Sequence, residues 1–156
     1  MATLNWVKKE LDDNGISYEE VEHNEAFTAQ EMAQREHITG HRVVKVVALM
    51  ADGKPVELIL PASKRVNLKT AGELLGSRNV RLASEAEIRS YFRDCEVGAI
   101  PPFRHWKNID LLMDTSMAVS GDILISSGTH RDAIRVRFED WFKITQPKVG
   151  AFTTAL

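Results

Sequence analysis

The first apolar residues of the chain recur at the spacing of a helix. Leu4, Val7 and Leu11 fall three to four positions apart, which places them on one helical face. Gly15 follows, and glycine ends many helices because it adopts the left-handed conformation without strain. Residues 16–21 then have the composition of a short strand. The pattern predicts a helix that ends near Gly15 and a strand directly after it.

A second apolar segment predicts a β-hairpin. Residues 43–50 are rich in valine and are apolar throughout except for Lys45. Ala-Asp-Gly-Lys-Pro at 51–55 provides a turn, and residues 56–60 resume the strand pattern. Two strands joined by so short a turn pair antiparallel.

Three segments carry the Ser/Thr-x-x-Glu pattern of a capping box, in which the two side chains bond free N–H groups at a helix start. They are residues 28–31, 70–73 and 84–87. We therefore expect three helices, the first reaching about Glu36, with a short strand at 80–82 between the other two.

The second half of the chain is richer in short strands. A Gly/Pro loop at 98–103 is followed by strand patterns at 109–113, 123–126 and 133–138, and then by a helical turn around Trp141 and a polar tail. Several connections are too short for a crossover helix, which favours antiparallel pairing. We expect an α/β protein of the α+β type, with a mixed, largely antiparallel sheet flanked by helices.

Composition and charge restrict the class of protein. The 156 residues suit a single domain, 1–156, and a 44% hydrophobic and 27% charged composition is that of a soluble globule. The net charge of −2 limits any nucleic-acid surface to a local patch. The single cysteine, Cys95, excludes an intramolecular disulfide. With neither a signal peptide nor an apolar run of membrane-spanning length, a cytoplasmic protein is expected.

Lys45 is the most informative single residue. Because strand side chains alternate between faces, Lys45 shares its face with Val43, Val47 and Leu49. A buried lysine must be paired, reach a cleft or lose its proton. The alternative is an edge-strand lysine that reaches water and guards against aggregation. The strand pattern alone favours neither interpretation.

The loop at 98–103, Gly-Ala-Ile-Pro-Pro-Phe, is a candidate for backbone catalysis. Two prolines stiffen it and leave few free N–H groups. Gly98 and Ala99 could point those groups at a carbonyl, as an oxyanion hole does. The alternative is a plain structural turn, which the same residues also favour.

The segment Ser-Ser-Gly-Thr-His at 126–130 ends a predicted strand with small residues and one histidine. Gly128 would allow close backbone approach, and His130 could donate to or accept from a ligand. A loop histidine that is merely solvated is the alternative, and it applies also to His23 at the end of the first strand.

Other catalytic chemistries find less support in the sequence. There is no G-x-S-x-G elbow of a serine hydrolase. No spaced Cys/His set suggests zinc, and we expect neither a metal nor another cofactor. Cys95 and His105 could form a thiol pair, although no local signature supports it.

Two small basic groups could contact phosphates. Lys64, Arg65 and Lys69 lie close in sequence beside apolar residues, and Arg135 and Arg137 share one face of a predicted strand. Charge on an exposed face is also ordinary solvation.

The order of these motifs resembles that of YbaK/EbsC proteins. The motifs are Lys45 in its apolar strand, the loop at 98–103, and Ser-Gly-Thr-His at 127–130 ahead of Ala-Ile-Arg-Val-Arg at 133–137. Such proteins are similar to the editing domain inserted in bacterial prolyl-tRNA synthetases. The resemblance extends over residues 16–144.

The resemblance implies a barrel-like sheet flanked by helices and a deacylase pocket for the aminoacylated 3′ end of tRNA. It implies that Lys45 anchors the terminal phosphates, that Gly98 and its neighbours hold the ribose and ester, and that His130 helps to shape the amino-acid pocket. These three are the expected catalytic residues. The expected substrate-binding residues are His23, Ala99, Ile100, Pro101, Ser127 and Gly128.

The resemblance also implies an activity and its partners. The expected reaction is trans-editing, in which mischarged aminoacyl-tRNA carrying Ala, Ser, Thr or Cys is hydrolysed by a positioned water or with help from the substrate's own hydroxyl. An aminoacyl-tRNA synthetase is a candidate partner, whereas DNA and membranes are not. The alternative is a non-catalytic module on the same fold that binds tRNA or a synthetase.

Overall fold

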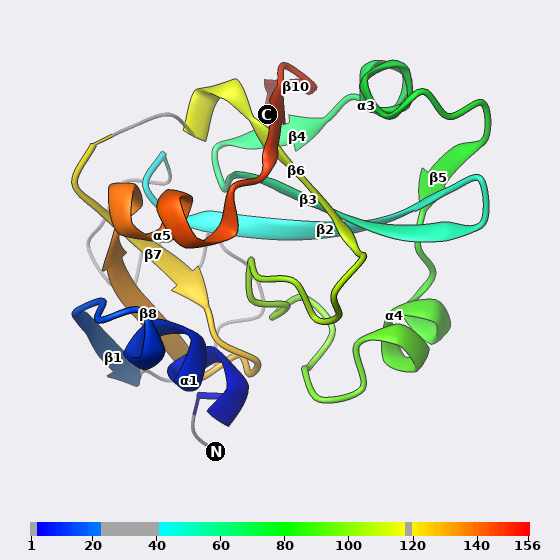
Figure 1. Ribbon diagram of the computed structural model, residues 1–156. Coiled ribbons are helices and arrows are strands. Elements are labelled where there is room, and N and C mark those ends of the chain that lie inside the picture. The colour runs from blue at the N-terminus through cyan, green and yellow to red at the C-terminus, as the bar shows by residue number, and fades with distance from the viewer. Residues whose placement is uncertain (1–2, 23–40, 118–119) are drawn as a thin grey trace.

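The computed structural model describes residues 3–22, 41–117 and 120–156 (Figure 1). The helix predicted after the capping box at 28–31, and His23, lie outside the described residues.

The chain begins with the predicted helix and strand. Helix α1 (Asn5–Asp13) buries Val7 and Leu11, as the spacing indicates. Gly15 follows it with φ of 67°, the left-handed conformation expected of a glycine after a helix. Strand β1 (Tyr18–Glu22) comes next. Both predictions are confirmed.

The predicted hairpin is the centre of the main sheet. Strands β2 (Val44–Ala51) and β3 (Lys54–Pro61) pair antiparallel over their whole length, with Asp52 and Gly53 at the turn. Both turn residues have positive φ, as a two-residue hairpin turn requires. The sheet order is β5-β2-β3-β6-β9, which adds β5 (Val80–Leu82), β6 (Asp110–Asp114) and β9 (Lys148–Gly150).

Two smaller sheets complete the fold. One has the order β1-β8-β7, with β7 (Asp122–Ser126) and β8 (Asp132–Arg137); the other pairs β4 (Lys64–Val66) with β10 (Thr153–Ala155). Among the described strands, β3–β6 and β6–β9 are the parallel pairs and the other pairs are antiparallel, which confirms the mixed, largely antiparallel prediction. The described strands form three sheets rather than one closed barrel. The predicted polar tail contains two of these strands, β9 and β10.

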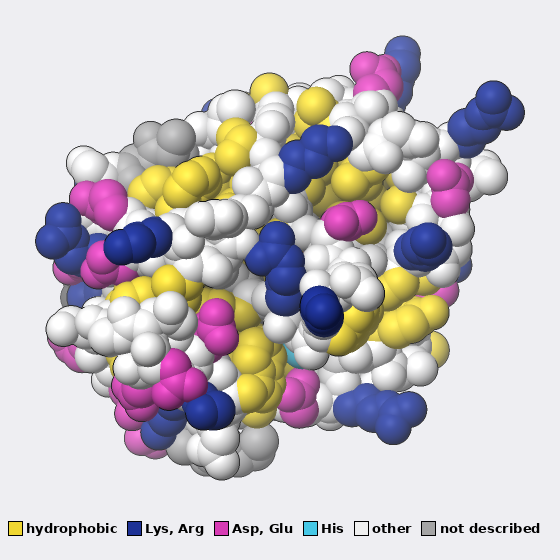
Figure 2. All heavy atoms as spheres, in the orientation of Figure 1, with side chains coloured by type: hydrophobic (Ala, Val, Ile, Leu, Met, Phe, Trp, Pro, Cys, Tyr) yellow, Lys and Arg dark blue, Asp and Glu magenta, His cyan; other side chains and the backbone are white. Residues whose placement is uncertain are grey.

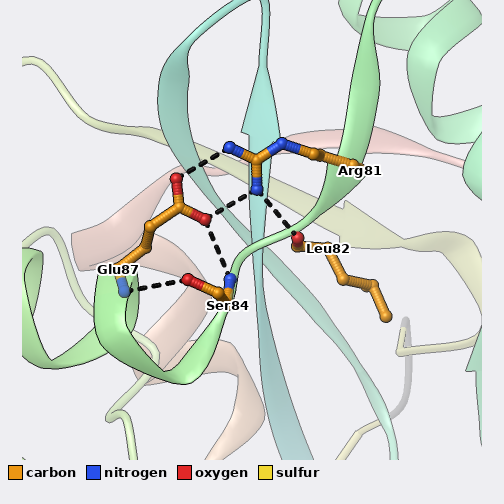
Figure 3. A network of polar contacts seen from close by, with 4 residues as sticks. All are labelled: Arg81, Leu82, Ser84 and Glu87. Carbon is orange, nitrogen blue, oxygen red and sulfur yellow. Dashed lines mark hydrogen bonds and ion pairs between the residues drawn. The ribbon is translucent and has the colours of Figure 1, made fainter.

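Two of the predicted capping boxes lie within the described residues, and the structure contains one of them. At α4 (Glu85–Tyr91), Ser84 and Glu87 bond each other's backbone N–H groups as predicted. Glu87 also binds Arg81 (Figure 3), and the two hydrogen bonds between them measure 2.6 and 2.8 Å. These contacts, the one with Arg81 first, lower the pKa of Glu87 to about 2.

The box predicted at 70–73 is wrong. Helix α3 (Leu68–Leu75) begins earlier, because Asn67 caps it by accepting a hydrogen bond of 3.2 Å from the Thr70 N–H. Asparagine is the stronger N-cap residue, so it takes the position. At the other end of the chain, the strand predicted at 133–138 stops at Arg137, and Phe138 begins α5 (Phe138–Thr145).

The main core lies where α1 and α5 pack on the β7–β8 side of the molecule (Figure 1). Val7, Leu11 and Trp141 meet the inward side chains of β8, Ile134 and Val136. A second cluster fills the space between α3 and the opposite face of the main sheet. None of the described helices has the length and apolar content needed to cross a bilayer.

Asp114 at the end of β6 holds the C-terminal tail in place. The residue is 2% exposed, and its carboxylate accepts hydrogen bonds from the Ser116 N–H and hydroxyl, the Phe152 N–H and the Thr153 hydroxyl. Burial alone would raise the pKa of Asp114, but these hydrogen bonds outweigh it and lower the pKa.

Candidate functional site

Lys45 is half-buried on β2, opposite Leu60 of β3. Its face-sharing neighbours belong to two apolar clusters: Val43 packs with Ala133, and Val47 packs against the cluster under α3. Burial lowers the pKa of the ammonium group. Within the described residues it has neither a hydrogen bond nor an ion pair. The cation is therefore held in apolar surroundings and available for a ligand.

A parallel bridge relates Lys45 to the segment that carries His130. Val43 of the β2 segment bridges Leu124 of β7, and both side chains belong to the same buried cluster. Both chains continue in the same direction from that bridge. Lys45 and Ser126 therefore lie two residues beyond it on their own strands, on the face shared by Val43 and Leu124.

The loop at 98–103 is a tight, largely buried structure. Gly98 is exposed and has φ of 89°, a conformation that favours glycine. The Ala99 N–H donates to the Glu96 carbonyl at 3.0 Å, so the expectation that Ala99 offers a free donor is wrong. Within the described residues, the N–H groups of Gly98 and Ile100 have no acceptor. These two, rather than Gly98 and Ala99, are the backbone donors that a ligand could use.

Three hydrogen bonds join residues 96–99, at the start of this loop, to residues 128–130. The Glu96 N–H donates to the Gly128 carbonyl at 2.8 Å, and the Gly128 N–H donates to the Ala99 carbonyl at 3.1 Å. The His130 N–H donates to Glu96 Oε1 at 2.8 Å. The structure thus brings two of the predicted site segments together and fixes their spacing through the backbone.

Lys45 and the loop approach β2 from opposite faces. Ile100 is 3% exposed and packs with Ala48, which alternation places on the other face from Lys45. Pro101 is also buried, and the Pro102 carbonyl accepts a hydrogen bond of 2.9 Å from Trp141 Nε1. The segment 126–130 is therefore the part of the site that links Lys45 with Gly98.

Ser127 and Gly128 have clear packing roles. The Ser127 side chain is fully buried and accepts a hydrogen bond of 3.1 Å from the Thr3 hydroxyl. Gly128 has φ of 116°, and a Cβ there would lie 2.7 Å from Leu4 Cγ. The close approach that the glycine permits is made by the N-terminal segment. Substrate contact by either residue stays a prediction, as does that by the half-buried His130.

The basic residues are dispersed rather than gathered. Arg137 is paired with Glu139 at 3.2 Å, whereas Arg135 is half-buried on β8. On the face shown in Figure 2, Lys and Arg side chains alternate with Asp and Glu. Two surface pockets have volumes of about 320 Å³, beside Gly53, and about 370 Å³, beside Lys148. None of the predicted site residues lines either pocket.

A buried polar cluster was not assigned from the sequence. His105 Nε2 lies 3.3 Å from Cys95 Sγ, and His105 Nδ1 lies 3.7 Å from Glu57 Oε1. The thiol of Cys95 and the imidazole of His105 are therefore in direct contact. Burial, Asp94 and Glu57 raise the pKa of the Cys95 thiol, which disfavours the thiolate that a nucleophile needs.

Glu57 is the most unusual member of this cluster. Its side chain is fully buried, and neither carboxylate oxygen has a hydrogen-bond partner within the described residues. Burial raises the pKa of Glu57 to about 7. Its position inside the apolar run 56–60 is the same kind of signal as Lys45 in β2, and could have drawn attention to it.

Comparison with known proteins adds a family and several relatives. The model of the family described as "Aminoacyl-tRNA editing domain" matches residues 23–144. The prolyl-tRNA editing protein ProX of Acetoanaerobium sticklandii is 23% identical over 148 residues, which cover 91% of this chain and 90% of that protein.

Two further matches are one relative that is covered only in part and one solved structure. The proline–tRNA ligase of Thiobacillus denitrificans is 32% identical over 106 residues, which cover 67% of this chain but only 18% of the ligase. A crystal structure described as a candidate trans-editing enzyme for prolyl-tRNA synthetase has a TM-score of 0.81 at 20% identity, and covers 96% of this chain and 95% of that one. This last match supports the fold.

Proposed function

Because the chain belongs to the aminoacyl-tRNA editing domain family, we propose that it hydrolyses mischarged aminoacyl-tRNA in trans. We further propose that the amino acid removed is small: alanine, serine, threonine or cysteine. The similarity to ProX over nine-tenths of both chains supports action as a separate editing protein.

The observation that carries the proposal is the backbone junction between the Gly98 loop and the segment 127–130. It holds the N–H groups of Gly98 and Ile100, which have no acceptor among the described residues, beside the chain that follows Ser126. The isolated parallel bridge between Val43 and Leu124, two residues before Lys45 and Ser126, supports placing Lys45 near that chain on the other face of β2. In this proposal the cation binds a phosphate and the two N–H groups bind the ester carbonyl.

The proposed reaction needs no nucleophilic side chain. A water oxygen adds to the ester carbonyl while the N–H groups of Gly98 and Ile100 stabilise the developing oxyanion. The bond to the ribose oxygen then breaks, and that oxygen takes up the proton that the attacking water has lost. The products are the free amino acid and the uncharged 3′ end. Lys45 contributes by positioning the terminal nucleotide, which reduces the entropy cost of attack.

The size of the amino acid follows from the reason for editing. A synthetase pocket separates substrates that differ by one methylene by only about 1–3 kcal/mol, so amino acids no larger than the cognate one enter it. Two of the matched relatives are named for proline. Alanine, serine, threonine and cysteine are all small enough to enter a pocket made for proline.

The decisive experiment is a release assay with tRNA charged separately with alanine, serine, threonine, cysteine and proline. We expect release of at least one of the first four and little release of proline. Lys45→Ala should abolish release, whereas Lys54→Ala on the same hairpin, an exposed lysine in β3, should not.

The same assay separates the enzyme from the binding module. Retention of charged tRNA with no release of any amino acid would refute the proposed hydrolysis. It would identify the chain as a non-catalytic module on this fold.

A further inference from the structure

Three chemically different ligand atoms converge beside the Gly98 loop. Asp94, Cys95 and His105 each offer one such atom, and the three lie within 4.8 Å of one another. In the part of the chain that the structure describes, this is the one group of three or more such side chains. We propose that these residues form a binding site for Zn²⁺.

The distances match the edges of a zinc coordination tetrahedron. With bonds of about 2.3 Å to sulfur and about 2.1 Å to nitrogen or oxygen, those edges are about 3.4–3.6 Å. The corresponding distances are 3.3 Å from Cys95 Sγ to His105 Nε2 and 3.4 Å from Cys95 Sγ to Asp94 Oδ1. The third, from His105 Nε2 to Asp94 Oδ1, is 3.8 Å. Small side-chain movements would therefore place all three atoms around one ion.

The surroundings supply the outer partners that zinc ligands usually have. A ligating histidine commonly directs its other ring nitrogen at a carboxylate, which fixes the ring and raises its basicity. Here His105 Nδ1 faces Glu57 Oε1 at 3.7 Å, and neither atom has a hydrogen bond within the described residues. The second oxygen of Asp94 accepts a hydrogen bond of 2.7 Å from Trp6 Nε1.

Burial and charge also favour a cation here. The side chain of His105 is 5% exposed and that of Glu57 is fully buried, and the His105 ring packs edge-on against Trp6 and Phe92. A buried carboxylate without a partner is costly, and a nearby divalent ion offsets that cost. The side chain of Asp94 is 44% exposed, which leaves a route for the ion and room for water as a fourth ligand.

The donor set selects the metal. Thiolate and imidazole favour Zn²⁺, whereas Mg²⁺ and Ca²⁺ prefer oxygen ligands alone. The ligands also lie on both sides of the loop at 98–103, with Asp94 and Cys95 before it and His105 after it. Bound Zn²⁺ would therefore close the base of the loop that carries Gly98, without taking part in the proposed hydrolysis.

The test uses the whole chain, freed of metal by dialysis against a chelator and titrated with Co²⁺ as a spectroscopic probe. We expect saturation at one ion per chain, a near-ultraviolet band from charge transfer between thiolate and Co²⁺, and loss of that band when Zn²⁺ is added. Cys95 is the single cysteine, so the band can arise from no other residue.

Variants assign the ligands and their supporting group. Cys95→Ser should abolish the band, and His105→Gln should weaken binding strongly, whereas His41→Gln at an exposed histidine should change neither. Glu57→Gln should retain the band but weaken Zn²⁺ binding about 10–100-fold, the usual effect of losing an outer partner. A purely structural role for Glu57 would leave the metal affinity unchanged.

A second measurement does not depend on whether the variants fold. Zn²⁺ should slow alkylation of Cys95 in the unaltered protein and raise its Tm, because the ion binds the folded state. Absence of the charge-transfer band at saturating Co²⁺, or an alkylation rate unaffected by Zn²⁺, would overturn the proposal. Neither result would bear on the deacylase proposal, which is tested with aminoacyl-tRNA.

Discussion

Gly98→Ala tests whether the loop acts through its backbone. Gly98 has φ of 89°, so alanine there is strained by roughly 1–2 kcal/mol and moves the adjoining N–H groups. Loss of one oxyanion donor typically lowers turnover by ~10²-fold or more. We therefore expect release of the amino acid at saturating substrate to fall by that factor, with little change in binding of uncharged tRNA. Single-turnover release and filter binding measure the two quantities.

The matched control is Gly53→Ala in the β2–β3 turn. Gly53 has φ of 81°, and apart from its own and its two chain neighbours' atoms no heavy atom lies within 4 Å of a Cβ built there, so this substitution adds similar backbone strain away from the loop. Both variants should lose similar stability, but only Gly98→Ala should lose turnover. A folded Gly98→Ala protein with near-normal turnover would refute the argument and move catalysis to a side chain such as His130.

Three more predictions concern other parts of the molecule. Lys45→Ala should remove deacylation while thermal unfolding stays cooperative, and full activity on the best substrate would exclude Lys45 from the site. Asp114→Asn should lower the free energy of unfolding by about 1.5–3 kcal/mol, because the amide accepts at only one of the two oxygens that Asp114 uses. Folding lowers the pKa of Asp114, so the full loss of stability should appear above about pH 5 and should shrink at lower pH as the carboxylate is protonated. Urea titrations at several pH values measure this loss, and an equal loss at acidic and neutral pH would contradict the prediction. In the metal-free protein, Cys95 should react with iodoacetamide at least ~10-fold more slowly than after unfolding in urea, and equal rates would revive a thiol mechanism.

Local patterns predicted the elements whose cause is local. The helix before Gly15, the hairpin around Gly53 and the box at Ser84 depend on residues within a few positions of one another. Strands β4, β9 and β10 have three residues each, too few for an alternating pattern to show. They pair with partners far away in the sequence, β10 with β4 and β9 with β6, and Asp114 adds a similarly distant contact to Phe152 and Thr153.

The candidate site was predicted in its parts but not in its arrangement. Lys45 and Gly98 stand out in the sequence as a charge among apolar residues and a glycine before two prolines. Their approach to β2 from opposite faces depends on how the loop packs, which no spacing reveals. The Cys95–His105 contact is likewise a result of the fold, because the intervening loop must turn back on itself to make it.

The β2–β3 hairpin explains why the two proposed sites can coexist. Lys45 pairs with Leu60, and Glu57 pairs with Ala48, so strand alternation directs the two charges to opposite faces of the hairpin. One face offers a cation for phosphate, and the other offers a carboxylate to orient His105. A register slip would exchange the faces of every side chain on one strand and expose its buried apolar residues, so the separation is fixed by the hydrophobic core. The effects of metal removal should therefore reach the substrate through the Gly98 loop and leave the electrostatic contribution of Lys45 unchanged.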